Sequence, residues 1–504
     1  MFYATIWALL PPVVAIAQAL ITKEVYSSLF LGIVVGAALV AGFAPVKTLD
    51  VIINDGFIAG VADAWNVGIF LFLILLGILV ALMNRTGGSA AFGRWAEKHV
   101  HTRAGAMLAT VLLGVLIFVD DYFNCLTVGS VMRPVADGHR ISRAKLAYLI
   151  DATAAPVCMI APISSWAAAV SGVAAKLDTG VSGIQLFIEA IPYNFYSLLT
   201  IVFVITMVVL GVDYGPMAAA ELKAAQTGDL GALSEEQEEG SSRANMWDML
   251  IPIILLIIFC VIGLIYVGGF WDPETNAGDF IAAFGDTDAF VGLPWGALIA
   301  LVLSIIYLCA RRVITFKGAM GCMTKGFNAM VPAILILTFA VSLKSMTGLL
   351  GAADYVEGLM KQASEGLFML LPAIIFVVAC LLAFATGTSW GTFGILIPIV
   401  LPIFNAAPDL QIMGISACLA GAVCGDHCSP ISDTTIMASA GANCNHIDHV
   451  STQIPYAVTV AAICFVNYIL AAFIRNVVIS LAIGVVMVIG TLLVIRSVQS
   501  RKAA

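Results

Sequence analysis

The residues best suited to chemistry lie between Ala422 and Asn445, where the chain reads AVCGDHCSPISDTTIMASAGANCN. Within ten residues around Pro430, this stretch carries two carboxyl groups, one imidazole and four hydroxyl groups, on Asp426, His427, Ser429, Ser432, Asp433, Thr434 and Thr435. Segments apolar enough to span a bilayer lie around it. Because polar and ionisable side chains are costly at membrane depth and usually face a cavity or a partner, the stretch indicates an ion or substrate pathway.

A hard cation such as Na+ prefers several oxygen ligands from carboxylates, hydroxyls and carbonyls. The second part of the stretch offers such a set, and we predict a cation site formed by Asp433, Thr434, Thr435, Ser432 and Ser429. Pro430 removes a backbone donor and so frees carbonyl groups that can face an ion. In the alternative interpretation, Ser432 or Asp433 only caps the N-terminus of a helix.

A weaker copy of the motif occurs in the first half of the chain. Ala161-Pro-Ile-Ser-Ser165 resembles Ser429-Pro-Ile-Ser-Asp433, and Pro430 follows Pro162 by 268 residues. Thr86-Gly87 and Thr347-Gly348, which each close an apolar segment, match at an offset of 261. Chance similarity is the alternative, but two matches in the same order indicate a duplicated unit. Ser164 and Ser165 are then the counterparts of the second motif, with Ser165 in place of a carboxyl group.

Three further carboxyl groups of the first half lie in or beside apolar segments. Asp120 and Asp121 end one such segment, with Asn124 one turn later, and they are either an interface pair or a functional pair. In the functional interpretation, Asp121 and Asn124 bind the cation while Asp120 exchanges a proton, because like charges and desolvation raise a carboxyl pKa. Asp151 lies in the apolar segment YLIDATAAP and needs either a partner or a proton.

A third group of polar residues opens the semi-polar region before the main motif. Thr386, Thr388 and Ser389 supply hydroxyl groups, and the glycines beside them let the backbone approach a ligand closely. Gly387, Ser389 and Gly391 also satisfy G-x-S-x-G, which marks a hydrolase only on a strand, turn and helix with a suitable His and acid. We therefore assign Thr386, Thr388 and Ser389, together with Asp426 and His427, to proton coupling or substrate binding, and we expect no enzyme.

Cysteine and histidine residues near the motif raise the alternative of a structural zinc site. The candidates are Cys424, His427, Cys428, Cys444, His446 and His449. Their spacing fits no common zinc pattern. We expect no metal other than Na+ and no further cofactor, with H+ as a second coupling ion.

The elements that must position these residues are membrane helices. The chain has 504 residues, of which 61% are hydrophobic and 11% charged, against about 25% charged in soluble domains. Apolar segments of the roughly 20 residues needed to span a bilayer lie near 2–21, 25–43, 66–83, 104–119, 194–212, 248–270, 292–310, 329–346, 367–385, 452–474 and 477–495. The semi-polar regions 120–177 and 386–445 predict broken helices or re-entrant hairpins. The fold class is thus an all-α polytopic membrane protein.

The chain divides into two predicted halves, residues 1–213 and 248–504, joined by an acidic cytoplasmic linker at 214–247. Loops rich in Lys and Arg, such as those with Arg311 and Arg496, predict cytoplasmic sides. If Arg85 lies inside and Lys344 outside, the two repeats have opposite orientations. Inverted repeats place substrate and ion sites at their interface. The eleven cysteines lie mostly in apolar segments, so we expect no disulfides, and no nucleic-acid signature is present.

The sequences Gly425-Asp-His-Cys-Ser-Pro-Ile-Ser-Asp-Thr-Thr435 and Gly387-Thr-Ser-Trp-Gly391 resemble the NhaC-type Na+/H+ antiporter family. The likeness extends to Asp120-Asp121 and to the Pro162 motif, so it covers most of the chain. It implies Na+-coupled transport across a bacterial inner membrane, by a fold of paired repeats with re-entrant hairpins. Members of this kind also exchange organic acids or take up amino acids. His427 and Cys428 stand where exchangers are expected to carry other residues, such as Lys and Met.

These observations favour a secondary active transporter that exchanges Na+ for H+ by alternating access. The alternative is a Na+-coupled carrier of a small amino acid or organic acid, whose carboxylate would bind at helix N-termini near Ser164 or Ser389. An ion channel is disfavoured because the polar residues form two separate clusters rather than a continuous lining. The expected partners are membrane lipid, Na+ and a small-molecule substrate, and a homodimer remains an option for the assembly.

Overall fold

The chain is all helical throughout the part that the structure describes. This computed structural model describes residues 2–22, 24–62, 64–88, 91, 100–118, 121–162, 164, 166–167, 170, 183–233, 244–352, 354–355, 368–404 and 408–503. Apart from one isolated backbone bridge between Ala232 and Cys444, the regular structure in these ranges is helical. The predicted fold class is therefore confirmed.

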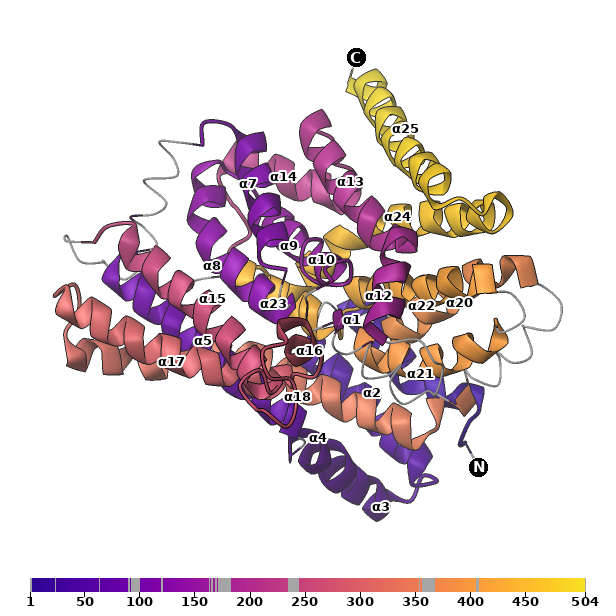
Figure 1. Cartoon of the computed structure of the whole chain (residues 1–504), viewed down its shortest axis with the longest axis horizontal. Coiled ribbons are helices and arrows are strands. Elements are labelled where there is room, and N and C mark those ends of the chain that lie inside the picture. The colour runs from indigo at the N-terminus through magenta and orange to yellow at the C-terminus, as the bar shows by residue number, and fades with distance from the viewer. Residues whose placement is uncertain are drawn as a thin grey trace.

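Figure 1 shows the helices in chain order. Those before the linker are η1 (Ile6–Leu9), α1 (Leu10–Thr22), α2 (Val25–Val40), α3 (Pro45–Asp50), the π-helical η2 (Val51–Ile58), α4 (Ala59–Ala62), α5 (Ala64–Thr86), α7 (Arg103–Leu116), α8 (Asp121–Gly138), α9 (Arg143–Asp151), α10 (Ala155–Cys158), α12 (Gly183–Ala190), η3 (Ile191–Tyr193), α13 (Phe195–Leu210) and α14 (Gly215–Thr227). Those after it are α15 (Trp247–Val267), α16 (Phe280–Gly285), α17 (Ala289–Ala310), α18 (Phe316–Leu349), η4 (Phe368–Leu370), α20 (Leu371–Thr386), α21 (Ser389–Ile403), α22 (Pro408–Cys428), α23 (Asp433–Ala442), α24 (His446–Ile474) and α25 (Val477–Ala503).

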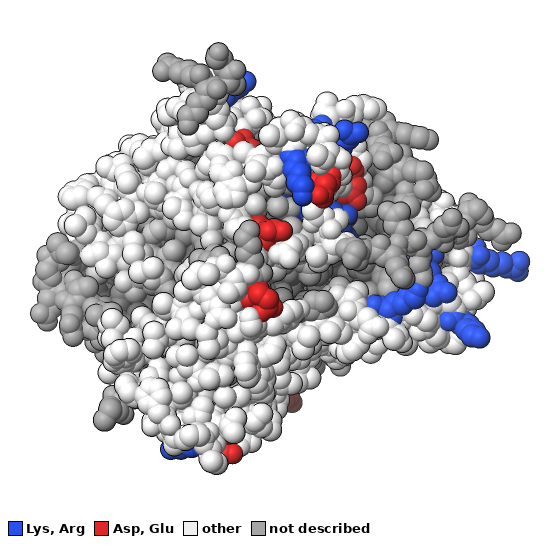
Figure 2. Space-filling model, turned by 180° about the vertical axis from the view of Figure 1, so that it is seen from behind, with Lys and Arg blue, Asp and Glu red and all other residues white. Residues whose placement is uncertain are grey.

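Five of the described helices are long and apolar enough to cross a membrane, and up to seven spans result if each of two bent pairs counts as one. The five are Asn66–Thr86, Trp247–Val267, Phe290–Ala310, His446–Ile474 and Val477–Ser500. The predicted spans 2–21, 25–43, 104–119 and 367–385 correspond to shorter apolar helices, and 329–346 lies within α18. Figure 2 shows a broad uncharged surface on one side of the molecule, as a lipid-facing surface requires.

The bent pair at 410–442 confirms the prediction of a broken helix within 386–445, whereas the other bent pair lies outside the two regions for which breaks were predicted. Leu186–Tyr193 meets Phe195–Leu210 at 46°, and Leu410–Cys428 meets Asp433–Ala442 at 48°. The second break contains Pro430, which has no N–H to continue a helix. After it, Ser432 restarts the chain as the N-cap of α23, because its hydroxyl group accepts a hydrogen bond from Thr435 N. The polar motif thus lies at the break.

The segments matched by sequence similarity run in opposite directions. Gly60 faces Val341 and Gly77 faces Gly326, so the α4–α5 segment is antiparallel to α18. Applied to α13, the sequence offset of 261 residues aligns this helix with residues 456–471 of α24. The Tyr468 hydroxyl group donates to Tyr193 O at 2.9 Å, and that of Tyr214 donates to Pro455 O at 3.3 Å, so α13 and α24 are antiparallel as well. An inverted arrangement requires repeat-related helices of opposite direction, and it stays a prediction for the two halves.

The two halves also meet where α8 crosses α23 at close range. A Cβ atom on Gly441 would lie 2.4 Å from Cys125 O, and one on Gly129 would lie 2.4 Å from the Gly441 carbonyl carbon. Only glycine allows this approach of two backbones. The crossing fixes the N-terminus of α8 beside that of α23.

Replacing Gly441 with Ala should therefore destabilise the protein by about 1–3 kcal/mol through overpacking, even though Ala favours helix. Gly490 of α25 provides a matched control, since a Cβ atom there would meet nothing within 4 Å. Thermal unfolding of both purified variants measures the difference. Equal midpoints for Gly441→Ala and the unmodified protein would contradict the tight crossing.

The first part of the predicted linker is a docked helix rather than a solvated chain. Met217, Glu221 and Ala224 of α14 are buried. The Glu221 carboxylate accepts a hydrogen bond from Ser142 N at 2.8 Å and forms an ion pair with Arg103. Beyond α14, Leu233 N donates to Asn443 O at 3.3 Å, next to the Ala232–Cys444 bridge. Residues 215–233 therefore lie over the N-terminus of α9, in the first half, and the C-terminus of α23, in the second half.

Candidate functional site

Helix N-termini from both halves converge at the centre of the molecule. α8 begins at Asp121, α21 at Ser389 and α23 at Asp433. A short turn at Trp166 begins where the Ser164 hydroxyl group accepts a hydrogen bond from Ala167 N at 3.2 Å. The Trp166 and Trp390 rings lie 6.0 Å apart, which joins that turn to α21. Because helix N-termini carry partial positive charge, this junction favours carboxylates and other anions.

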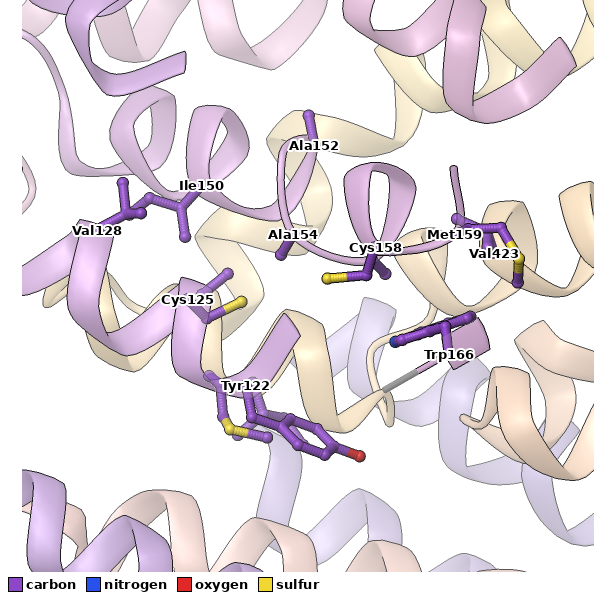
Figure 3. Close-up of a cluster of buried hydrophobic side chains, with 14 of the residues drawn as sticks. Tyr122, Cys125, Val128, Ile150, Ala152, Ala154, Cys158, Met159, Trp166 and Val423 are labelled. Carbon is purple, nitrogen blue, oxygen red and sulfur yellow. The ribbon is translucent and has the colours of Figure 1, made fainter. Parts of the chain in front are cut away.

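Asp433 connects the two halves directly. Its carboxylate accepts a hydrogen bond from the Tyr122 hydroxyl group of α8, and its second oxygen accepts one from Thr434 N at 3.0 Å. Figure 3 shows Tyr122 and Cys125 on one helix, with the Tyr122 hydroxyl group pointing away from the apolar side chains around Cys125 and Cys158. The Ser432 and Thr434 hydroxyl groups lie 2.9 Å apart beside this carboxylate. Asp433 thus remains half-buried among oxygen atoms.

Asp426 is the second carboxylate of the junction and is almost completely buried. The Ser389 hydroxyl group lies 2.6 Å from its Oδ2 atom, and the Thr435 hydroxyl group donates to its backbone carbonyl at 3.4 Å. Asp121 is buried at the start of α8, next to Tyr122, whose hydroxyl group donates to Asp433. We call Asp121, Asp426 and Asp433 the carboxylate cluster.

Several predicted ligands instead hold the broken backbone in place. The hydroxyl groups of Ser429, Ser164 and Thr386 donate to Phe384 O, Cys158 O and Leu382 O at 2.7–2.8 Å. The Asn124 amide donates to Gly114 O, Ile117 O and Thr153 O at 2.6–3.1 Å. Thr388 accepts a hydrogen bond from Gly391 N at 3.3 Å. These side chains position the junction, while the predicted residues Asp120 and Ser165 lie outside the described residues.

A second polar cluster lies beside the first and was only partly predicted. The Asp151 Oδ2 atom lies 3.1 Å from His449 Nε2, accepts a hydrogen bond from Gln453 Nε2 at 3.0 Å and lies 3.9 Å from His427 Nε2. All four side chains are buried, and we call Asp151, His427, His449 and Gln453 the histidine cluster. The Tyr196 hydroxyl group lies 2.8 Å from His427 Nδ1.

Sequence reasoning missed Tyr122, Tyr196 and Gln453, and it considered His449 only as a zinc ligand. The spacing of four between His449 and Gln453 puts two polar side chains on one face of the apolar α24, which was the available signal. Tyr122 gave no such signal, because its partner is 311 residues away.

The geometry limits how a cation could bind here. Among the residues that the structure describes, no three His, Cys, Asp or Glu side chains lie close enough together to hold a metal ion. Na+ would therefore be bound by one or two carboxylates together with hydroxyl and backbone oxygens. The Asp433 carboxylate with Ser432 and Thr434 offers such a mixed set.

Residues 157–473 match the model of the Na+/H+ antiporter family. An uncharacterized protein of Haemophilus influenzae is 36% identical over 486 residues, covering 94% of this chain and 92% of its own length.

Two further relatives are more distant. The arginine/ornithine antiporter ArcD of Halobacterium salinarum is 26% identical over 47% of this chain and 44% of its own length. The malate-2H(+)/Na(+)-lactate antiporter of Bacillus subtilis is 26% identical over 39% of this chain and 42% of its own length. Each alignment thus spans less than half of that relative.

A solved structure of Neisseria gonorrhoeae MtrF, described as illuminating a class of antimetabolite efflux pumps, covers 89% of this chain and 84% of its own chain. Its sequence identity is 11% and its TM-score is 0.32, a similarity too low to carry a conclusion.

Proposed function

We propose that this chain, which belongs to the Na+/H+ antiporter family, exchanges Na+ for H+ across a bacterial inner membrane by alternating access. The observation that carries the proposal is the carboxylate cluster, in which α8 of the first half and α22 and α23 of the second half each supply one carboxylate. A site shared between two repeats changes its exposure when the repeats move relative to each other.

We assign Na+ binding to Asp433 with Ser432, Thr434 and Thr435, and to Asp121 from the first half. The Tyr122 hydrogen bond holds the Asp433 carboxylate towards α8, so a cation bound there contacts both halves. Ser429 and Asn124 complete the proposed cation site by fixing the backbone around it. The proton or substrate residues are Asp151, Asp426 and His427, with Asp120, Ser164, Ser165, Thr386, Thr388 and Ser389.

The family is one of transporters, so the protein is not an enzyme. Ser389 opens a helix and lies next to the Asp426 carboxylate, an arrangement that does not correspond to the strand, turn and helix of a nucleophile elbow. The G-x-S-x-G match at Gly387–Gly391 is therefore incidental.

The second candidate function is Na+-coupled transport of a small amino acid or organic acid. It is favoured by the two relatives whose names state exchange of arginine and ornithine or of malate and lactate. The cargo carboxylate would bind at the N-termini near Ser389 or Ser164, where helix dipoles favour an anion.

Thermal unfolding of the purified protein separates the two candidates. If Na+ binds the folded state, a concentration one hundred times its Kd should stabilise the protein by about 2.7 kcal/mol, whereas K+ at equal ionic strength should not. Arginine, ornithine, malate and lactate should then add nothing. A Na+-dependent stabilisation by one of these solutes would favour the second function, and no effect of Na+ would reject both.

A further inference from the structure

The histidine cluster lies between the carboxylate cluster and the helix ends of α9 and α23 that residues 215–233 cover. α9 begins at Arg143, whose amide donates to Leu230 O of the docked segment, and it ends at Asp151. α24 begins at His446, one turn before His449. The cluster therefore joins α9 of the first half to α22 and α24 of the second.

Asp151 is a buried carboxylate, and no Lys or Arg among the described residues forms an ion pair with it. The nearest cation on its own helix, Lys145, pairs with Asp213 instead. Four buried atoms of the cluster have no hydrogen-bond partner in the described structure, namely Asp151 Oδ1, His427 Nε2, His449 Nδ1 and Gln453 Oε1. A buried carboxylate with no permanent counter-charge requires a positive charge from outside the chain.

The spacing of the cluster excludes a metal ion as that charge. Asp151, His427 and His449 do not form a metal-binding group among the described side chains. A proton, in contrast, needs no cavity, and a protonated His449 would supply the positive charge at hydrogen-bond distance from the Asp151 carboxylate. Because His449 Nε2 faces the Asp151 carboxylate, His449 Nδ1 is the free atom that can accept the proton.

We infer that Asp151 and His449 form the proton-carrying pair of this transporter, an inference that rests on the proposed function. A proton binds at His449 Nδ1, the imidazolium donates from Nε2 to the Asp151 carboxylate, and the net charge of the pair changes from −1 to 0. Release of the same proton restores the carboxylate and the neutral imidazole. Gln453 orients the pair by donating to both Asp151 and His427 O.

Several titratable groups surround the pair. They are Tyr148 on α9, Asp426, His427 and Cys428 on α22, His446 and Tyr456 on α24, Tyr196 on α13, and Lys145 with Asp213. Asp426 directly precedes His427, whose Nε2 atom lies 3.9 Å from the Asp151 carboxylate. Two negative carboxylates repel each other, so Na+ in the carboxylate cluster and a proton on the pair relieve the same repulsion and can replace one another. This replacement of bound Na+ by a bound proton is the basis of the proposed exchange.

Proteoliposomes containing the full chain test the inference with two assays, Na+/Na+ counterflow and Na+ uptake driven by a pH gradient. His449→Gln keeps a donor towards Asp151, and Asp151→Asn removes the charge. Both variants should lose pH-driven uptake by about a hundredfold, because the proton carrier is gone. His449→Gln leaves the Asp151 charge in place, so it should keep counterflow to within about twofold. The control is His139→Gln, since each ring nitrogen of His139 lies 2.9 Å from a backbone carbonyl, that of Val135 or Val100.

Unchanged pH-driven uptake in both variants would overturn the inference while leaving the proposed function intact. Loss of counterflow in His449→Gln as well would also overturn it, because the pair would then be part of the cation site or of the folded framework. An unmodified protein that shows no Na+ counterflow would instead refute the proposed function, and the inference with it.

Discussion

Replacing Asp433 with Asn should reduce Na+-dependent transport by about a hundredfold while leaving the protein folded. The amide oxygen of Asn can still accept the hydrogen bond of Thr434 N, and its NH2 group can donate to the Tyr122 hydroxyl oxygen, so the local structure is kept. The negative charge is lost, and an uncompensated ion in a buried site costs about 3 kcal/mol, which corresponds to that factor. Radioactive Na+ uptake into proteoliposomes measures the effect.

The matched control for this change is Asp229→Asn. Asp229 is exposed and pairs with Lys223 in the docked linker segment, far along the chain from the junction. It should transport Na+ like the unmodified protein, since exposed ion pairs contribute little. Normal Na+ dependence in Asp433→Asn would remove this residue from the proposed site.

Replacing Asp426 with Asn should have an effect of similar size, because this carboxylate is more deeply buried than Asp433. Ser389→Ala should be milder, at about tenfold, since it removes only a hydrogen bond to a charged group, worth roughly 1.5–3 kcal/mol. The same uptake assay, run at several Na+ concentrations, compares the two variants. If Ser389→Ala were the more damaging change, Ser389 rather than Asp426 would be the more important of these two proton or substrate residues.

The sequence was sufficient to locate the carboxylates of the junction. Asp426 and Asp433 stand out because ionisable residues are rare among segments of such high hydropathy. Pro430 at the break predicted a bent helix, since it cannot continue the helical hydrogen bonds, and the 48° bend lies there. The carboxylates and the bend could both be predicted because each depends on the chemistry of single residues.

Features that depend on tertiary contacts could not be predicted. Tyr122 and Asp433 meet across 311 residues, and Asp151 and His449 across 298. In the sequence, Tyr122 is one aromatic residue among many, and only the crossing at Gly129 and Gly441 brings it to the carboxylate. Pairs of this kind can be predicted only when the packing of the two halves is known.

The prediction of a solvated chain was wrong for the start of the linker, which forms the docked helix α14. The polar segment 215–245, with its acidic run at Glu235, Glu236, Glu238 and Glu239, predicted a solvated linker. The buried face of α14 is small, with Met217 and Ala224 beside Glu221, and its stability comes from capping the end of α9. A polar residue that satisfies another helix terminus looks the same in sequence as one that faces water.

The central claim is exchange of Na+ for H+, and Na+ uptake into acid-loaded proteoliposomes free of organic solutes tests it most directly. The account predicts that an inside-acid pH gradient drives saturable accumulation of radioactive Na+, and that collapsing the gradient with a protonophore abolishes it. Accumulation that occurs only after an amino acid or organic acid is added, whatever the pH gradient, would contradict it.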